Sequence, residues 1–220
     1  RVADNRFEGI YCDPSGLKHP AHGKKASLRG GLTYSGGLAE YAIHMWDSPQ
    51  GSAHVIERNQ IVNCARGIGV GMATDVYGTS VRNNTVFSKH AGSAEHDVGI
   101  NVERGHNVSV FNNTVFLSSP KAYSNAIEYR WGSTAGVQIR NNLTNHAITS
   151  RNSATATLSH NVTKAQGAWF VGVASGDLHL VSCSNAAVDA KGKSLAEVKD
   201  DLDGDLRAGS NDVGADQCVN

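Results

Sequence analysis

Two rows of side chains able to do chemistry recur at fixed offsets from a series of isoleucines. The residues directly after these isoleucines are Tyr11, His44, Gly69, Asn101, Glu128 and Thr149. The residues three positions after them are Asp13, Trp46, Gly71, Glu103, Arg130 and Arg151. Imidazole and carboxylate groups can act as general acids or bases, and guanidinium groups can pair with carboxylates or sulfates. The spacing therefore predicts one face on which acidic, basic and cationic groups lie together.

Each residue type in these rows suggests a role. The candidate catalytic residues are His44, Glu103, Glu128 and Arg130. Glu103 and Glu128 would be the acid pair of a hydrolase, and Arg130, with Arg151, would be the cation that neutralises an anionic group in an elimination. The base and the acid of an elimination would be chosen from His44, Tyr11, Lys89, His90 and His96. The candidate binding residues are Tyr11, Asp13, Trp46, Asn101 and Arg151 from the rows, with Lys89 and His96 from a flanking loop. No metal ligand is predicted among them. The alternative is a solvated sheet face on which Glu103 and Arg130 form an ordinary cross-strand pair.

Short strands are expected to position both rows. A Gly or an Ala precedes each isoleucine, and the isoleucines are Ile10, Ile43, Ile68, Ile100, Ile127 and Ile148. Side chains alternate along a strand, so inward isoleucines place both rows on the outward face. A slip of one residue would invert this arrangement. Gly69 and Gly71 predict a shallow dip in the middle of the face.

A row of asparagines sets the period of the chain. Each follows an aliphatic residue by three positions, and the members are Asn5, Asn59, Asn84, Asn113, Asn142 and Asn161. The intervals after Asn59 are 25, 29, 29 and 19 residues, which indicates a solenoid. The interval of 54 residues before Asn59 is interpreted as two repeats, with Gly31 in the place of the missing asparagine. Stacked asparagines can hydrogen-bond from one repeat to the next.

These repeats resemble those of right-handed parallel β-helix proteins, the pectate-lyase-like superfamily of polysaccharide lyases, hydrolases and epimerases. The resemblance covers about residues 1–190 and implies a single all-β domain of about seven coils, with residues 191–220 as a C-terminal cap. It includes no catalytic motif of any one lyase family, so no catalytic residue is transferred by resemblance. The fold hosts many chemistries, and activity must be argued from the site.

The C-terminal segment carries its own signals. Ser194 and Glu197 form a capping box, which predicts a short helix from Leu195 to near Asp200. The following Asp-x-Asp-Gly-x-x-Arg and Asp-Val-Gly-Ala sequences resemble an ending of many secreted bacterial β-helix proteins. We expect Asp–Arg pairs to lock the last coil there. The acidic run also suggests calcium as an alternative, the one cofactor that the sequence indicates.

The cysteines divide into two groups. Cys183 and Cys218 bracket the C-terminal segment, where a disulfide would tie down the tail. Cys12 and Cys64 are expected to be buried thiols.

Composition narrows the possible partners. The formal net charge is zero, which does not suggest a nucleic-acid partner, and no apolar run is long enough to span a membrane. The chain opens inside a repeat, from which we expect a removed leader, an N-terminal partner domain or a longer parent protein. The leading expectation is a secreted protein acting on an acidic polysaccharide, with β-elimination as the reaction. The alternative is a non-catalytic glycan-binding, adhesin or structural module.

Overall fold

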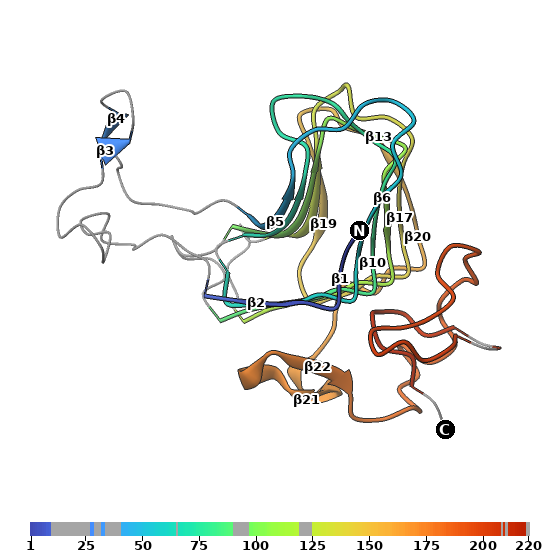
Figure 1. The fold of residues 1–220 in the computed structure, drawn as a ribbon. Helices are drawn as coiled ribbons and strands as arrows, with labels where there is room; N and C mark the ends of the chain where they lie inside the picture. Colours follow the sequence, from blue (N-terminus) through green and yellow to red (C-terminus); the bar gives the residue numbers. More distant parts are fainter. Residues whose placement is uncertain are drawn as a thin grey trace.

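Three parallel β-sheets wind around a common interior in this computed structural model (Figure 1). The structure describes residues 1–9, 27–28, 32–33, 41–64, 66–89, 97–118, 125–207, 209 and 211–218. Consecutive strands of the coils belong to different sheets, so each circuit of the chain forms one coil. The predicted all-β parallel solenoid is confirmed. Within the described ranges, no helix has the length and apolar character needed to cross a membrane.

Each sheet takes one strand from each coil. The first sheet contains β1 (Val2–Ala3), β6 (His54–Glu57), β10 (Thr79–Arg82), β14 (Ser109–Phe111), β17 (Val137–Arg140) and β20 (Ala156–Ser159). The second contains β2 (Arg6–Glu8), β7 (Gln60–Val62), β11 (Thr85–Ser88), β15 (Thr114–Leu117) and β18 (Leu143–Thr144). The third contains β5 (Tyr41–Met45), β8 (Arg66–Val70), β12 (Val98–Glu103), β16 (Asn125–Arg130) and β19 (Ile148–Arg151). Two short pairs complete the strands before the C-terminal segment: parallel β9 (Val76–Tyr77) with β13 (Gly105–His106), and antiparallel β3 (Ser27–Leu28) with β4 (Leu32–Thr33).

Equivalent residues of successive coils stack into columns inside the solenoid. The isoleucine column of the third sheet is in register from Ile43 through Ile68, Ile100 and Ile127 to Ile148. The three central members are fully buried. Burial of one such side chain is worth about 1.5–3 kcal/mol, so the column is a main source of stability. The predicted alignment of the third sheet is therefore confirmed for these coils, while Ile10 lies outside the described residues.

The asparagines form a continuous hydrogen-bonded ladder. The backbone N–H of Asn84 donates to Oδ1 of Asn113 at 3.1 Å, and the Asn84 amide Nδ2 donates to the same oxygen at 2.9 Å. The same pair of bonds joins each of the six asparagines to the next. The amide also donates to backbone carbonyls, as Asn84 does to Ile56 and Arg82. The ladder thus satisfies polar groups at the turn between the first and second sheets.

The interval between Asn5 and Asn59 is one coil, and its interpretation as two repeats is wrong. Val2 pairs directly with Ile56, and the Asn5 amide donates to Asn59 Oδ1 at 3.0 Å. The first sheet accordingly has six strands, one for each coil. Neither Gly31 nor the expected strand from Ile10 to Asp13 is among the described residues. Lengthening a loop adds little to the entropic cost of closing it, so one coil can be much longer than the others. The length of an interval therefore does not give the number of coils.

After β20 the chain turns back along the outside of the coils. The segment η1 (Gly167–Trp169), β21 (Phe170–Gly172), η2 (Val173–Ser175) and β22 (Asp177–Leu180) forms an antiparallel pair. The antiparallel pair lies beside the second sheet (Figure 1, orange), and the residues beyond it lie beside the turn between the first and second sheets (Figure 1, red), where Arg82 and Asn83 bond to them. Phe170, Leu178 and Val213 pack against Val62 and Phe87, which face outward. The C-terminal segment therefore covers one side of the solenoid.

The helix expected from Leu195 is absent. Residues 195–198 instead form a turn, in which the Val198 N–H donates to the Leu195 carbonyl at 3.1 Å. Carbonyls that a helix would use internally bond elsewhere: Glu197 accepts from Arg82, and Asp200 accepts from Asn83 at 2.8 Å. Six residues make a helix too short to persist against such contacts.

The expected Asp–Arg pairing occurs between Asp200 of the C-terminal segment and Arg58 of the coils at 2.8 Å, whereas Arg207 holds the segment together through backbone carbonyls. Its guanidinium donates to the carbonyls of Asp200, Gly214 and Ala215 at 2.8–3.0 Å. It also reaches Oδ1 of Asn83 on the coils at 3.3 Å. Burial lowers the pKa of Arg207 to about 10, and the surrounding aspartates oppose this effect, so the group stays charged at neutral pH. The segment is anchored along the flank of the coils rather than on the last one.

Both expectations about the described cysteines are confirmed. Cys183 and Cys218, which are 35 positions apart in the sequence, form a disulfide. Cys64 is a buried thiol. Cys12 lies outside the described residues.

Candidate functional site

The strand register brings the predicted rows together on the outward face of the third sheet. His44 pairs with Gly69, Gly69 with Asn101, Asn101 with Glu128 and Glu128 with Thr149. Glu103, Arg130 and Arg151 are likewise in register on three successive coils. Residues stacked in this way are about 4.8 Å apart. Lys89 lies apart from them, exposed after β11, while Tyr11, Asp13, His90 and His96 fall outside the described residues.

A third outward row precedes the isoleucines and was missed by strict alternation. It contains Tyr41, Arg66, Val98 and Asn125. The small residue between this row and the isoleucine points inward: a Cβ on Gly67 would lie 2.1 Å from the Gly99 carbonyl oxygen, and one on Gly99 would lie 2.5 Å from Val115. A Cβ does not fit at Gly67 or Gly99, and the equivalent positions of the other coils hold nothing larger than alanine. Two consecutive inward positions turn the preceding side chain outward. The recurring small residue was the signal in the sequence.

Tyr41 fills the dip that Gly69 was expected to leave. A Cβ on Gly69 would lie 2.4 Å from the Tyr41 ring, so the ring rests directly on the glycine. The Asn101 amide donates to Tyr41 Oη at 2.6 Å, and the His44 ring centroid is 4.9 Å away. Burial raises the pKa of Tyr41 to about 12, so the phenol remains protonated at neutral pH. Gly71 is required by the backbone itself: its φ of 78° is left-handed, and a Cβ at this position would clash with the Glu103 carbonyl.

The two glutamates on this face are buried, although they point outward. Glu103 accepts from Asn101 at 2.6 Å, from the Trp131 indole at 2.9 Å and from Arg130 at 3.3 Å. Their neighbours cover them because every coil contributes a long side chain to the same face. Each oxygen of Glu103 has at least one donor, which suits a structural anion better than an open proton acceptor.

Glu128, on the next coil, is likewise surrounded by hydrogen-bond donors. It accepts from Asn125 at 2.7 Å and from Arg151 at 3.1 and 3.2 Å, and Arg130 lies 3.3 Å away. The Thr149 hydroxyl donates a hydrogen bond to Oδ1 of Asn125 at 2.9 Å and so helps to orient that amide. Arg130 therefore bridges Glu103 and Glu128, which makes the predicted acid pair part of one ion network.

Cations and aromatic rings form the exposed layer above these acids. The side chain of Arg151 is 38% exposed against 5% for Glu128, and that of Arg130 is 23% exposed against 9% for Glu103. Trp131, which alternation did not single out, is 39% exposed. Its ring is held by the bond to Glu103 and by the Arg130 guanidinium 5.1 Å from its centroid. Trp46 is also exposed, with its ring 4.8 Å from that of His44.

A separate acidic cluster lies in the C-terminal segment. Carboxylate oxygens of Asp201, Asp203 and Asp216 lie within 4.8 Å of one another. Asp201 accepts from the backbone N–H groups of Asp203, Asp205 and Gln217, each at 2.9 Å. Asp216 accepts from the backbone N–H of Leu180 at 2.7 Å. These bonds account for Asp201 and Asp216 as turn-forming residues, and Asp203 pairs with His179 at 3.0 Å.

No protein-family model, curated protein or solved structure matches this chain. The class is therefore defined by the fold itself: the protein is a parallel β-solenoid with a buried asparagine ladder.

Proposed function

We propose that this protein binds an extended acidic polysaccharide along the outward face of the third sheet. One observation carries the proposal: buried glutamates hold Arg130 and Arg151 in place while leaving the guanidinium groups as the more exposed partners. An anionic ligand would meet N–H donors before it met carboxylates. Guanidinium groups bind carboxylates and sulfates in a planar, two-bond geometry.

The layout of the face suits a polymer. Arg130 and Arg151 stand on adjacent coils, about 4.8 Å apart along the axis, which approximates the rise of one sugar in an extended chain. Trp131 adjoins them and offers a flat, fixed surface for a sugar ring, because an amphipathic indole contributes large contact area at low entropic cost. Trp46 provides a second ring three coils away.

The proposal includes membership of the pectate-lyase-like group and a location outside the cell. The supports are the asparagine ladder in parallel coils and the disulfide, since disulfides persist in oxidising compartments.

Catalysis of β-elimination on the same face is the second candidate. It rests on the contact of His44 with Tyr41, which pairs a possible base with a phenol that stays protonated. β-Elimination needs a base for the C5 proton and an acid for the leaving oxygen. The binding proposal is favoured because Tyr41 is buried at 7% exposure and therefore offers its hydroxyl little access to a leaving oxygen.

The test is affinity electrophoresis in gels containing alginate, pectate, a glycosaminoglycan or a neutral glucan. We expect retardation in at least one acidic gel, lost in Arg130→Ala and kept in Arg6→Ala, which removes an exposed arginine from another sheet. Retention lost equally in both variants would show nonspecific charge attraction and refute the site. Ultraviolet absorbance of unsaturated uronates, followed in parallel, decides whether elimination also occurs.

A further inference from the structure

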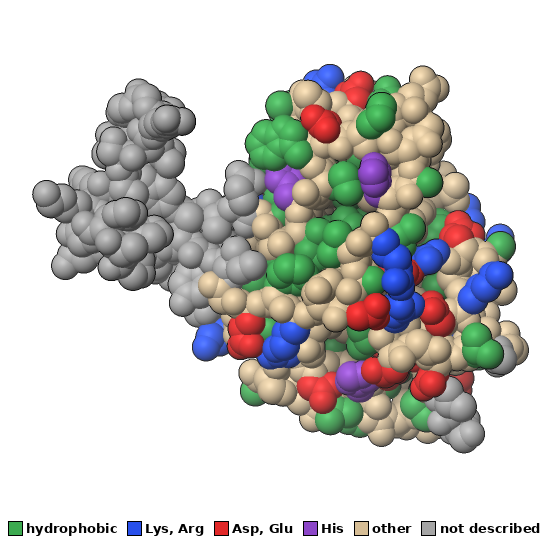
Figure 2. Space-filling model, in the orientation of Figure 1, with side chains coloured by type: hydrophobic (Ala, Val, Ile, Leu, Met, Phe, Trp, Pro, Cys, Tyr) green, Lys and Arg blue, Asp and Glu red, His purple; other side chains and the backbone are tan. Residues whose placement is uncertain are grey.

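A tryptophan and two arginines stand in one column of the outward face of the third sheet. Strand pairing places Trp46 in line with Gly71, Glu103, Arg130 and Arg151, which come from successive coils. Equivalent positions are about 4.8 Å apart along the axis. Figure 2 shows a hydrophobic patch beside a histidine over the end of β5, the strand that Trp46 follows. The column therefore has an aromatic end and a cationic end.

Trp131 reaches back along this column. It follows Arg130 on the same coil, but its indole Nε1 donates to Oε2 of Glu103, on the preceding coil, at 2.9 Å. The ring thus extends toward the coil of Glu103, which is two coil steps, about 9.6 Å, from the coil of Trp46. The coil between them contributes Gly71, so the column carries no side chain between Trp46 and Glu103.

The backbone of Trp131 indicates that the ring is held in place before any ligand arrives. Its φ of 74° is left-handed, a conformation that is costly for a bulky residue. The bond to Glu103 and the Arg130 guanidinium, 5.1 Å from the ring centroid, keep the side chain there. Strained residues of this kind cluster at ligand sites, where a fixed contact surface lowers the entropic cost of binding.

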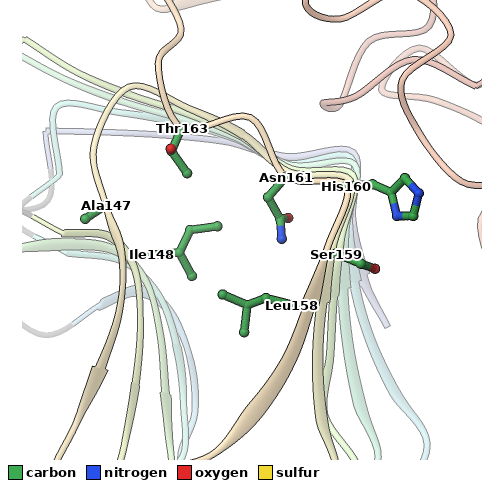
Figure 3. Close-up of a pocket in the computed structure, with 7 residues that line it drawn as sticks. All are labelled: Ala147, Ile148, Leu158, Ser159, His160, Asn161 and Thr163. Carbon is green, nitrogen blue, oxygen red and sulfur yellow. The ribbon is translucent and has the colours of Figure 1, made fainter.

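A hollow of about 420 Å³ at the last coil does not offer the same chemistry. Leu158, Ile148 and Asn161 point into it, whereas the imidazole of His160 points away (Figure 3). Among the described residues that line this hollow, none is an arginine, a lysine or a carboxylate. An acidic sugar would meet no opposite charge there, so the column on the third sheet is the better site.

We infer that this column binds four consecutive sugars of a linear acidic polysaccharide, one sugar for each coil, along the solenoid axis. The inference rests on the proposed function of the face. An acidic sugar meets Arg130 and Arg151, and the next sugar stacks on Trp131. The third lies over Gly71, and the fourth stacks on Trp46.

This arrangement sets a minimum length for the ligand. Three sugars that start at Arg130 end above Gly71 and do not reach Trp46. A fourth sugar is already held close to Trp46 once the first three are bound, so its contact adds to the affinity at a high effective concentration. Affinity should therefore increase in a step when the ligand reaches four sugars.

The test is isothermal titration calorimetry with oligosaccharides of two to six sugars from alginate, pectate and chondroitin sulfate, the last in even lengths. In a series that binds, we expect the dissociation constant to fall about tenfold on reaching four sugars and to change less beyond that. Trp46→Ala should remove this step without changing the affinity for shorter ligands, which also shows that the variant is folded. Arg130→Ala should weaken binding at every length.

Two further variants serve as controls. Trp46→Phe should keep most of the step, because it retains an aromatic ring. Val171→Ala, which shortens an exposed valine of β21, should keep all of it. A dissociation constant that does not change with length, for a polymer that retards the protein in a gel, would overturn the inference and leave the proposed function standing. So would a step that persists in Trp46→Ala. Failure of every polymer to retard the protein would refute the proposed function and the inference together.

Discussion

Glu128 accepts two hydrogen bonds from Nη1 of Arg151, at 3.1 and 3.2 Å. The glutamate is buried, and the arginine above it is the more exposed partner. Arg130 approaches the same carboxylate at 3.3 Å. One buried anion therefore orients two guanidinium groups on adjacent coils. If the face binds acidic sugars, Glu128 is a positioning residue, and its negative charge helps an anionic ligand to bind.

Glu128→Gln tests this relationship, because the substitution could either raise or lower the affinity for an acidic polysaccharide. Removal of a negative charge should by itself strengthen attraction to an acidic polysaccharide. We expect the opposite, about a tenfold loss of affinity, because both arginines lose the ion pair that fixes them. Affinity electrophoresis measures the change. Glu8→Gln, an exposed carboxylate paired with Arg6, is the control and should leave affinity unchanged or slightly higher. A stronger complex with Glu128→Gln would show that the carboxylate is only a counter-charge.

Asn113→Ala should destabilise the solenoid by about 3 kcal/mol or more. Asn113 accepts two bonds from Asn84 and donates to Val81, Phe111 and Asn142, all in a fully buried site. Each buried group left without a partner costs about 1–3 kcal/mol. Urea unfolding followed by circular dichroism gives the free energy of unfolding. The same substitution at Asn5, the exposed end of the ladder, should cost about 1 kcal/mol or less, and equal losses would contradict the role assigned to burial.

Arg207→Lys should lower the free energy of unfolding by about 2–4 kcal/mol, although charge is conserved. A lysine cannot reproduce the fork that reaches Asp200, Gly214 and Ala215 at once. Limited proteolysis should then cut first within residues 181–218, because this segment would detach from the coils. Arg6→Lys at the exposed end of the second sheet serves as the control, for which we expect almost no change. Unaltered stability of Arg207→Lys would mean that the apolar contacts anchor the segment without the arginine.

Stability should fall as pH rises through the titration of His179. Burial lowers the pKa of this imidazole, but the hydrogen bond that its Nδ1 donates to Asp177 at 2.5 Å and the charges of Asp203 and Asp216 outweigh it, so the pKa is raised above 6.5. The folded state therefore binds the proton more tightly than the unfolded state. The resulting stabilisation is complete below about pH 6.5 and is lost as pH rises through the folded pKa.

The thermal midpoint measured between pH 5.5 and 8.5 checks this expectation. It should decrease over the upper part of the range in the unmodified protein, and the decrease should be smaller in His179→Gln. His54→Gln in β6 is the matched control and should keep the full decrease. An identical pH profile for His179→Gln would assign the effect to other groups.

The parts of the fold that repeat were predictable, and the parts that occur once were not. Asn59, Asn84 and Asn113 recur because each occupies the same environment in its coil, so the same residue is favoured at each step. The isoleucine register followed from the same logic. The prediction of a short helix from Leu195 was wrong because a local capping signal competes with hydrogen bonds to the coils, such as the one from Arg82 to the Glu197 carbonyl.

The site divides in the same way. From the sequence alone came the parallel coils, the columns and the grouping of Asn101, Glu103, Glu128, Arg130 and Arg151 on one face, since two-residue alternation and the repeat length determine them. Only the tertiary structure decided that Tyr41 covers Gly69, that Trp131 is fixed by Glu103, and that the glutamates lie beneath the arginines. Those features depend on how side chains of different lengths on neighbouring coils fill a shared surface. That packing is a property of the stacked coils and not of any one segment of the chain.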